Sequence, residues 1–417
     1  MRFIYSLLMY LLAPFIVLRL WWKGRKLPSY RQRIAERFYL GKRVNAKVDV
    51  WIHAVSLGEV IAAIPLINAM LSKSWSVLVT TMTPTGSERV STYFGDKVHH
   101  QYVPYDLPGV LKRFFRQINP KVGVIMETEL WPNLLFQAHK AKVPLILANA
   151  RLSESSFRGY LRLRFLFQPM LNLFNAILAQ SDDDARRFIA LGVKVDLVKA
   201  LGNMKFDVQT NQISSVPFRQ LKDLWGSDRL VVIAASTHHD EEALILQHLK
   251  RLQASIPQAL LLIAPRHPER FPTVIKLCKE SGFNTGVRSN PTSISKENEV
   301  IVLDSLGELL GFYGVSDYAF VGGSLVPVGG HNVLEAIAMG IPVISGKLVN
   351  NFKTIMKDLA DAQAIQMIEQ AKELVDVVIR LEDDVAARNQ MVANASAVLE
   401  KNRGSVAKHL EVIGRWL

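Results

Sequence analysis

The stretch "GGSLVPVGGHNVLEAIAMGIPVISG", residues 322–346, contains the pattern that decides the fold. It predicts the end of an apolar strand, a glycine-rich loop, a short helix and a second apolar strand. A strand that leads through a loop into a helix and then into another strand is typical of parallel sheets with helices on both faces. The "GGHN" segment at the start of the helix needs a separate explanation.

Two interpretations fit this segment. Asn332 and Glu335 fit a helix cap with its capping-box partner, and Gly340 fits a helix stop. Alternatively, the start of the helix binds an anion, because helix N-termini present unpaired N–H groups and the positive end of a dipole. The two are compatible, since a pair of loop glycines allows a close approach of the backbone. With the polar strand ends described below, we favour the ligand.

The same alternation of apolar runs and helical stretches extends over most of the chain. A polar stretch at 203–228, which we interpret as a linker, divides it into two series, and residues 371–417 are predicted to be helical. A length of 417 residues suits two domains, so two successive doubly wound parallel sheets are the simplest architecture. The predicted strands are "VDVWIHAVS" (48–56), "SVLVTTMT" (76–83), "KVGVIMETE" (121–129), "VPLILANAR" (143–151), "AILAQS" (176–181), "LVVIAAST" (230–237), "ALLLIAPR" (259–266), "NEVIVLDS" (298–305), "DYAFVGGS" (317–324) and "PVISG" (342–346).

The composition limits the kinds of partner. The single cysteine, Cys278, excludes a disulfide framework and indicates a reducing compartment. The net charge of +13 predicts an acidic partner, which is nucleic acid, anionic lipid or a phosphorylated substrate. No zinc finger and no aromatic-basic motif supports nucleic acid, so we expect none.

The N-terminus predicts a membrane anchor. Residues 3–18, "FIYSLLMYLLAPFIVL", carry no charge, and Trp21 and Trp22 suit a membrane interface. Ten Lys and Arg residues against one acid, Glu36, follow between residues 19 and 47. A cleaved signal peptide is the alternative, but no small-residue cleavage site follows. We favour an uncleaved anchor, spanning or embedded in one leaflet, with the body of the protein in the cytoplasm.

Polar residues lie at the carboxyl ends of the predicted strands, where ligands of such sheets bind. In the second series these ends are rich in hydroxyls, with glycines before helices and an arginine, Arg266, that suits a charge-assisted pair with phosphate. They are 236–238, 265–267, 304–308 and the opening stretch, and together they predict a nucleotide-phosphate site.

In the first series three acids are candidates. Glu59 follows a strand-to-helix turn, where it is either a helix-end acid or a general base. Glu127 and Glu129 end another strand, and two carboxylates so placed are hard to explain as core. The "HHDEE" run at 238–242 lacks the HExxH spacing of a metal site, and Ser56 lacks the G-x-S-x-G elbow of serine hydrolases.

These motifs, in this order, resemble the bacterial Kdo (3-deoxy-D-manno-octulosonic acid) transferases of lipopolysaccharide synthesis. The matching pieces lie between about residues 51 and 342, and the anchor matches too. The resemblance implies a GT-B fold with an acceptor domain first and a nucleotide-sugar domain second. It also implies CMP-Kdo as donor, a lipid A precursor (lipid IVA) as acceptor, inversion at the anomeric centre, and no metal or cofactor. The pieces are "WIHAVSLGE", "ETELWPN", "NARLSE", "GNMKFD", "PRHPERF", "GELLGFYGVSDYAFVGGS" and "GGHNVLEAIAMGIPV".

The resemblance also assigns roles to residues. Glu59 matches the general base, and Glu129 and Lys205 match residues that stabilise the transition state. The chain departs from the family pattern at Asp240, where glycine is frequent, and at Ala336, where proline is frequent. The residues that match contacts to CMP are Pro265, Arg266, Leu306, Gly307, Glu308, Gly330, Asn332, Val333, Leu334 and Glu335.

The expected organisation follows from these assignments. Residues 1–26 form the anchor, 27–208 the acceptor domain, 209–390 the CMP-sugar domain, and 391–417 a helix that packs back toward the first domain. The expected location is the inner membrane, with its lipids as partners. Two other functions stay open at this point: a GT-B transferase or epimerase that uses a UDP-sugar, and a membrane-anchored anion binder without catalysis.

Overall fold

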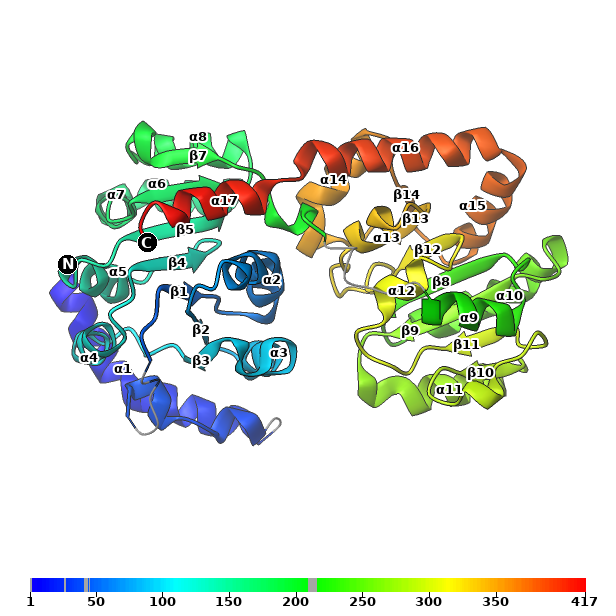
Figure 1. The fold of residues 1–417 in the computed structure, drawn as a ribbon, viewed down its shortest axis with the longest axis horizontal. Coiled ribbons are helices and arrows are strands. Elements are labelled where there is room, and N and C mark those ends of the chain that lie inside the picture. Colours follow the sequence, from blue (N-terminus) through cyan, green and yellow to red (C-terminus); the bar gives the residue numbers. More distant parts are fainter. Residues whose placement is uncertain (1, 26–27, 41–43, 45, 209–215) are drawn as a thin grey trace. The chain divides into compact units, whose positions relative to one another are not determined.

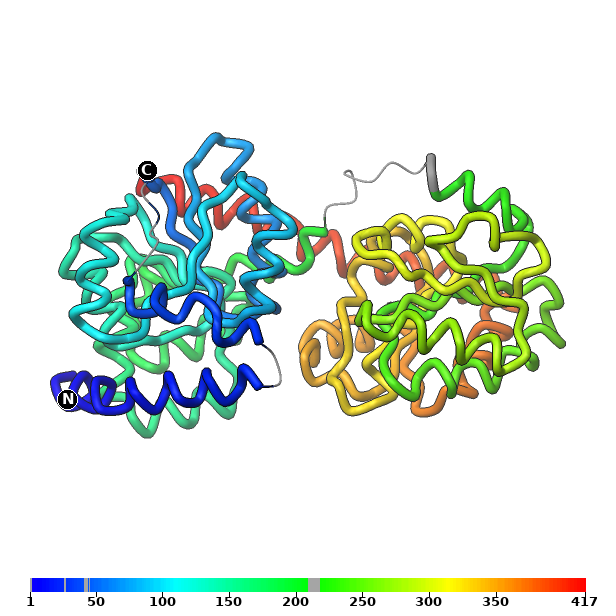
Figure 2. Tube along the Cα trace, turned by 90° about the horizontal axis from the view of Figure 1, so that it is seen from below, coloured from blue at the N-terminus to red at the C-terminus, as the bar shows by residue number. Residues whose placement is uncertain are grey.

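The computed structural model describes residues 2–25, 28–40, 44, 46–208 and 216–417. The chain forms two compact units, Met1–Asp207 with Asn402–Leu417, and Val208–Lys401 (Figure 1). The first division lies next to the boundary expected at 208. The second lies at the end of helix α16 (Val385–Asn402), whereas the boundary expected at 390 falls inside this helix. Both termini of the chain belong to the first unit (Figure 2).

The first unit contains a parallel sheet in the order β3-β2-β1-β4-β5-β6-β7. The order reverses between β1 and β4, and ligands of doubly wound sheets bind at the carboxyl ends of strands beside such a reversal. The strands are β1 (Val50–His53), β2 (Val77–Thr81), β3 (His99–Tyr102), β4 (Val122–Met126), β5 (Leu145–Ala150), β6 (Ala176–Ala179) and β7 (Val198–Ala200).

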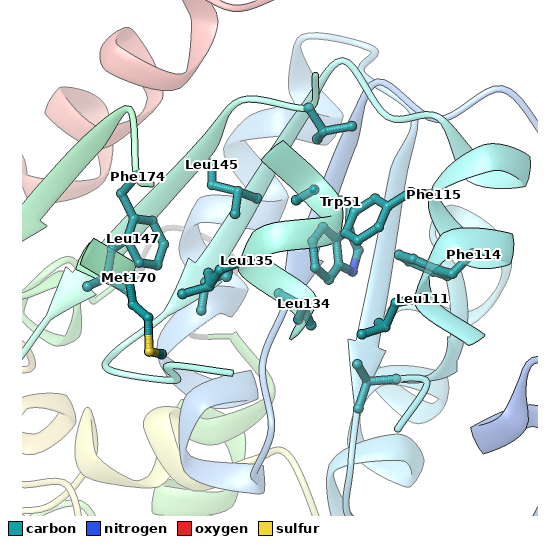
Figure 3. Close-up of a cluster of buried hydrophobic side chains, with 14 of the residues drawn as sticks. Trp51, Leu111, Phe114, Phe115, Leu134, Leu135, Leu145, Leu147, Met170 and Phe174 are labelled. Atoms are coloured by element: carbon teal, nitrogen blue, oxygen red, sulfur yellow. The ribbon is translucent and has the colours of Figure 1, made fainter. Parts of the chain in front are cut away.

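Helices cover both faces of this sheet because successive strand residues point to opposite sides. Trp51 packs on one face with α4, α5 and α7 (Figure 3) and with part of α1. Val50 and Ile52 pack on the other face with α2, α3 and α17. The helices of this unit are α1 (Arg2–Lys23), α2 (Leu57–Ser72), α3 (Pro84–Phe94), α4 (Pro108–Ile118), α5 (Pro132–Lys140), α6 (Glu154–Arg162), α7 (Arg164–Leu171), α8 (Asp182–Ala190) and α17 (Ser405–Gly414).

The second unit repeats this plan, with strands in the order β10-β11-β9-β8-β12-β13-β14 and a reversal between β8 and β12. Its strands are β8 (Val231–Thr237), β9 (Leu260–Pro265), β10 (Thr285–Val287), β11 (Val300–Val302), β12 (Tyr318–Val321), β13 (Val343–Gly346) and β14 (Gln366–Ile368). Its helices are α9 (Val216–Trp225), α10 (Glu241–Ser255), α11 (Phe271–Glu280), α12 (Leu309–Tyr313), α13 (Leu334–Ala338), α14 (Lys353–Asp361), α15 (Lys372–Asp383) and α16. Two Rossmann-like parallel sheets, as expected for a GT-B fold, are therefore confirmed.

The structure corrects the sequence prediction in one segment. Residues 203–228 are not a linker throughout, because they include α9. Trp225 at its end is fully buried, and the ring of Phe218 packs edge-on against that of Phe312 at a centroid distance of 5.1 Å. The burial of these two large side chains holds the helix on the second unit.

Helix α1 is long and apolar enough to cross a membrane by length and composition. It belongs to the first unit, and its residues Met9, Ala13, Ile16 and Leu20 pack against the same core as Trp51. This helix is compatible with the predicted membrane anchor.

Candidate active site

The topology of the first unit brings three predicted acids to one edge of the sheet. Glu59 follows β1, and Glu127 and Glu129 follow β4. Strands β1 and β4 are hydrogen-bonded neighbours on either side of the reversal in strand order. Glu59 precedes the other two acids by 68 and 70 residues in sequence, yet all three share the position where such sheets bind ligands.

Glu59 lies in the first turn of α2 and is only 7% exposed. The Val55 N–H and the Ser56 hydroxyl donate to its two carboxylate oxygens, each at 2.8 Å. The Glu59 N–H in turn contacts Ser56 Oγ at 3.4 Å, so Ser56 is the helix cap, while the Glu59 carboxylate reaches back to the N–H of Val55, the residue before the cap. The helix-end interpretation from the sequence is therefore correct, although it does not account for the burial of the carboxyl group.

Burial raises the pKa of Glu59 to about 7, and the charges of Glu129 and Glu127 add to this effect against the two hydrogen bonds. The pKa of Glu129 is also raised, first by burial, although Trp131 Nε1–H donates to its Oε2 at 2.8 Å. A carboxyl group that titrates near neutral pH suits proton transfer, since a general base works best with a pKa close to the operating pH.

The backbone at these strand ends is strained. Glu127 has φ +55° and Asn149, near the end of neighbouring strand β5, has φ +53°. The left-handed region costs energy for residues other than glycine, and such residues gather at functional sites. The chain forms a turn at Glu127 and Thr128 directly after β4, and Glu129 follows this turn.

Lys205 adds a positive charge to the three acids. It lies in the 3-10 helix η5 (Met204–Phe206) and is half-buried. Burial lowers the pKa of its ammonium group, Arg151 lowers it further, and Glu127 and Glu59 oppose the change. The three predicted catalytic residues, Glu59, Glu129 and Lys205, are thus brought into one cluster, together with Arg151.

The C-terminal helix α17 fixes the position of η5. Asp207 accepts hydrogen bonds from the N–H groups of Gly404 and Val406, at 2.6 and 2.5 Å, and so caps the start of α17. On the next turn, the buried His409 Nε2 accepts the Asn149 N–H at 3.2 Å, and Asn149 Oδ1 accepts the Met204 N–H at 3.1 Å. The chain on either side of Lys205 is therefore hydrogen-bonded to α17 or to the strand end that α17 holds.

In the second unit a buried carboxylate organises the corresponding sheet edge. Glu241, at the start of α10, is 0% exposed and accepts four backbone N–H groups. These come from His238 at 2.9 Å, Gly323 at 2.7 Å, and Ser324 and Leu325 at 3.0 Å each. The carboxylate therefore joins the loop after β8 to the loop after β12, the two strands that flank the reversal in this sheet.

Glycine is required at the start of the second of these loops. A Cβ atom at Gly322 would lie 2.8 Å from Glu241 Oε2 and 2.9 Å from Thr237 Cα. A side chain at this position would therefore push the two loops apart.

Three histidines, from the segments that follow β8, β9 and β12, lie close together. His238 Nε2 lies 2.8 Å from His331 Nε2, and the His267 ring is 5.2 Å from that of His238 between centroids. Burial, aided by Arg266, lowers the pKa of His331 to about 4, and the pKa of His238 is lowered as well. At neutral pH both imidazoles are uncharged, so one Nε2–H donates to the other Nε2.

The predicted CMP contacts lie on this edge of the second sheet. Pro265 ends β9, and the charge of Arg266 acts on His331, so β9 and the glycine-rich loop approach one another. Val333 and Leu334 are fully buried. Leu306 is 68% exposed, Gly307 has φ +83° and Gly330 has φ +77°.

The polar members of this predicted set have protein partners. Asn332 Oδ1 accepts the Leu334 N–H at 3.2 Å, and Asn332 Nδ2 donates to Glu335 Oε1 at 3.3 Å. Arg288 donates to Glu308 Oε1 at 2.9 Å. Asn332 therefore contacts the first turn of α13, although the residue at the N-cap of this five-residue helix is Val333.

Several residues of both sites were not identified in the sequence. Glu241 was noted only within a run that lacked metal-site spacing, and Asp207 and His409 were not singled out. No group of three or more His, Cys, Asp or Glu side chains is placed to hold a metal ion in the part of the chain that the structure describes.

Comparison with known proteins identifies relatives over the full length of the chain. The family model of the 3-deoxy-D-manno-octulosonic-acid transferases (kdotransferases) matches residues 32–208. The 3-deoxy-D-manno-octulosonic acid transferase of Haemophilus influenzae is 39% identical over 421 residues, which cover 100% of this chain and 99% of the relative. The protein of the same name from Bordetella pertussis is 34% identical, with 100% and 99% coverage.

A solved structure shows the same fold at low sequence identity. A glycosyltransferase from Rickettsia africae has a TM-score of 0.58 and is 13% identical, covering 89% of this chain and 98% of its own. At this identity the likeness concerns the fold alone.

Proposed function

The chain belongs to the Kdo transferases, a family of glycosyltransferases, and we propose that it moves Kdo from CMP-Kdo to a hydroxyl group of lipid IVA with inversion at the anomeric carbon. The observation that carries this proposal is the buried carboxyl group of Glu59 beside two further acids and a lysine. This arrangement suits proton transfer next to a centre on which positive charge develops.

Glu59 is the proposed general base. It takes the proton of the acceptor hydroxyl as the hydroxyl oxygen attacks the sugar carbon and the bond to the CMP phosphate breaks. A pKa of about 7 leaves a large share of Glu59 ionised in a neutral cytoplasm while keeping it basic enough to accept the proton. The hydrogen bonds from Val55 and Ser56 hold both carboxylate oxygens and so fix the direction of the lone pairs.

Glu129 and Lys205 are proposed to stabilise the transition state. The carboxylate of Glu129, held by Trp131, faces positive charge on the reacting sugar carbon, and Lys205 offsets negative charge. Kdo is a sugar acid, so a neighbourhood with two cations, Lys205 and Arg151, suits it better than it suits a neutral sugar.

The second unit is the proposed site of the CMP group. Arg266 beside the glycine-rich loop suits the donor phosphate, and the proposed partner of the ribose hydroxyls is Glu335. The positive φ of Gly329 and Gly330 lets the loop backbone approach the phosphate without a Cβ. The proposed reaction uses no metal and no cofactor, and CMP-Kdo is a substrate.

The proposed location is the cytoplasmic face of the inner membrane, with α1 as the anchor. The apolar helix and the basic residues after it support this proposal, since they suit a lipid-linked, phosphorylated acceptor. Membership in the Kdo transferase family weighs against the two other functions, an enzyme that uses a UDP-sugar and an anion binder without catalysis.

The dependence of the transfer rate on pH tests the assignment of the base. Glu59→Gln keeps the shape of the side chain and removes the base. We therefore expect the rate to fall by about a hundredfold or more, and we expect the remaining activity to lack the fall in rate below pH 7. Glu129→Gln is the matched variant, and it slows the reaction but keeps the acidic limb. A Glu59→Gln enzyme that transfers Kdo at a rate close to that of the unaltered protein contradicts the proposal.

A further inference from the structure

Helix α1 has two distinct faces, and both are apolar. One face packs on the first unit, while the other is exposed along the whole helix. The outer face includes Ile4 at 66%, Leu11 at 63% and Leu18 at 62% exposure. Its other large apolar residues are Phe3, Leu7, Leu8, Leu12, Phe15, Trp21 and Trp22.

The inner face contacts the body of the protein from one end of the helix to the other. The Ser6 hydroxyl donates to Asn133 Oδ1 at 2.8 Å, and the Gly109 N–H donates to Tyr10 Oη at 3.2 Å. Ile16 and Leu20 pack on the core two and three turns further along. A helix that crosses a bilayer as a separate rod would give up all of these contacts.

The corner between α6 and α7 has the same character. Leu161, Leu163 and Phe165 are 43%, 46% and 60% exposed, and they alternate with Arg162 and Arg164. Neither arginine forms an ion pair within the described ranges of the chain. Apolar side chains that alternate with unpaired cations suit the boundary between acyl chains and anionic headgroups.

The two surfaces belong to one part of the first unit. Helix α5 packs against both α1 and α7 (Figure 1), and the inner residues of α1 and of the α6–α7 corner contribute to one core. Tyr160, in α6, has its pKa raised by burial and then by the charge of Glu129, so the corner lies beside the proposed catalytic acids.

We propose that α1 lies parallel to the membrane surface, and that the exposed face of α1 and the α6–α7 corner together dock on one leaflet with anionic headgroups. The outer face of α1 enters the boundary between headgroups and acyl chains, and Arg162 and Arg164 contact lipid phosphates. This docking would bring Glu129 close to the membrane surface. The proposal does not depend on the reaction proposed above, because it concerns only where the protein meets lipid.

The test is the depth of fluorescent labels in vesicles that contain phosphatidylglycerol. The only cysteine, Cys278, is buried, so cysteines introduced at the surface of the full chain can be labelled selectively. Single variants Ile4→Cys, Leu11→Cys and Leu18→Cys have matched exposure, and each carries an environment-sensitive label. Lipids with a nitroxide near the headgroup or near the chain end report the depth of the label by quenching.

We expect all three α1 labels to shift to the blue and to be quenched alike, and more strongly by the nitroxide near the headgroup. A label at Leu163→Cys should behave in the same way, whereas one at Leu224→Cys, also 46% exposed but on α9, should not change. Arg162→Gln and Arg164→Gln should each weaken binding to these vesicles roughly fivefold and leave binding to neutral vesicles unchanged.

Three results would overturn the proposal. If Leu11 is quenched best by the nitroxide at the chain end, while Ile4 and Leu18 are quenched best near the headgroup, α1 spans the bilayer. If the label at Leu163 stays in water, the corner does not dock. A blue shift without vesicles that grows with protein concentration would make this face a contact between copies of the chain.

Discussion

Glu59→Gln should make the protein more stable at pH 8 while it slows the reaction. Burial raises the pKa of Glu59 from an ordinary value of 4.5 to about 7. The folded protein therefore binds this proton more tightly than the unfolded chain does. The stabilisation from the bound proton is fully present below pH 4.5 and is lost as the pH rises through 7.

The magnitude follows from the two pKa values. A tenfold change in proton affinity corresponds to about 1.4 kcal/mol, so the ionised carboxylate costs at most about 3.5 kcal/mol of unfolding free energy above pH 7. Glutamine removes this cost. Its amide oxygen can accept the Val55 N–H and its amide N–H can donate to Ser56 Oγ, so both hydrogen bonds at Glu59 have replacements. For a unit of this size, about 3.5 kcal/mol corresponds to a ceiling of roughly 7–14 °C in melting temperature.

Thermal unfolding of the detergent-solubilised protein at pH 5 and pH 8 measures this effect. The gain of Glu59→Gln should be small at pH 5 and large at pH 8. Glu154→Gln is the control, because that carboxylate is exposed, its pKa is lowered by Arg158, and its replacement brings no gain at pH 8. A Glu59→Gln protein that is no more stable than the unaltered protein at pH 8, with the same dependence on pH, would refute the reasoning.

Four further substitutions test the second unit and the C-terminal helix. Arg266→Ala should weaken CMP binding in calorimetry with little loss of stability, and unchanged CMP affinity removes Arg266 from the site. Arg270→Ala, in contrast, should lower the free energy of unfolding by about 3–5 kcal/mol, because it leaves the buried Glu242 carboxylate without its partner. Glu241→Ala leaves four buried N–H groups without an acceptor, so denaturant unfolding should show a loss of roughly 4 kcal/mol or more, and a loss under about 1 kcal/mol contradicts this role. Asp207→Ala removes the cap of α17, so it should lower the free energy of unfolding by about 1–2 kcal/mol and slow the transfer without changing CMP affinity. An unchanged transfer rate would show that α17 does not position Lys205.

The sequence predicted the central strands of both sheets because they are buried on both faces and form continuous apolar runs. Four edge strands were missed, β3, β7, β10 and β14. They are only three or four residues long and include polar or half-buried positions, so no apolar run marks them. Helix α9 carried a signal that was overlooked, since Phe218, Leu221 and Trp225 recur at helical spacing.

The candidate site was likewise predicted only in part. Glu59, Glu127 and Glu129 could be identified from the sequence, because they follow predicted strands directly and the sheet collects strand ends at one edge. The burial that raises the pKa of Glu59 could not be predicted from the sequence, because it depends on how the surrounding elements pack. The contact between His409 and Asn149 joins residues 260 positions apart, and the one between Glu241 and Gly323 joins residues 82 apart, so no local pattern predicts either.

The mass of the reaction product tests the central claim most directly. The purified full-length protein is incubated with CMP-Kdo and lipid IVA in the presence of EDTA, alongside Glu59→Gln and a reaction with UDP-sugars in place of CMP-Kdo. We expect the mass of the lipid to rise by whole Kdo units as CMP is released, with a rate about a hundredfold lower for Glu59→Gln and no product from UDP-sugars. A lipid whose mass stays unchanged with CMP-Kdo, or rises only with a UDP-sugar, would contradict the account.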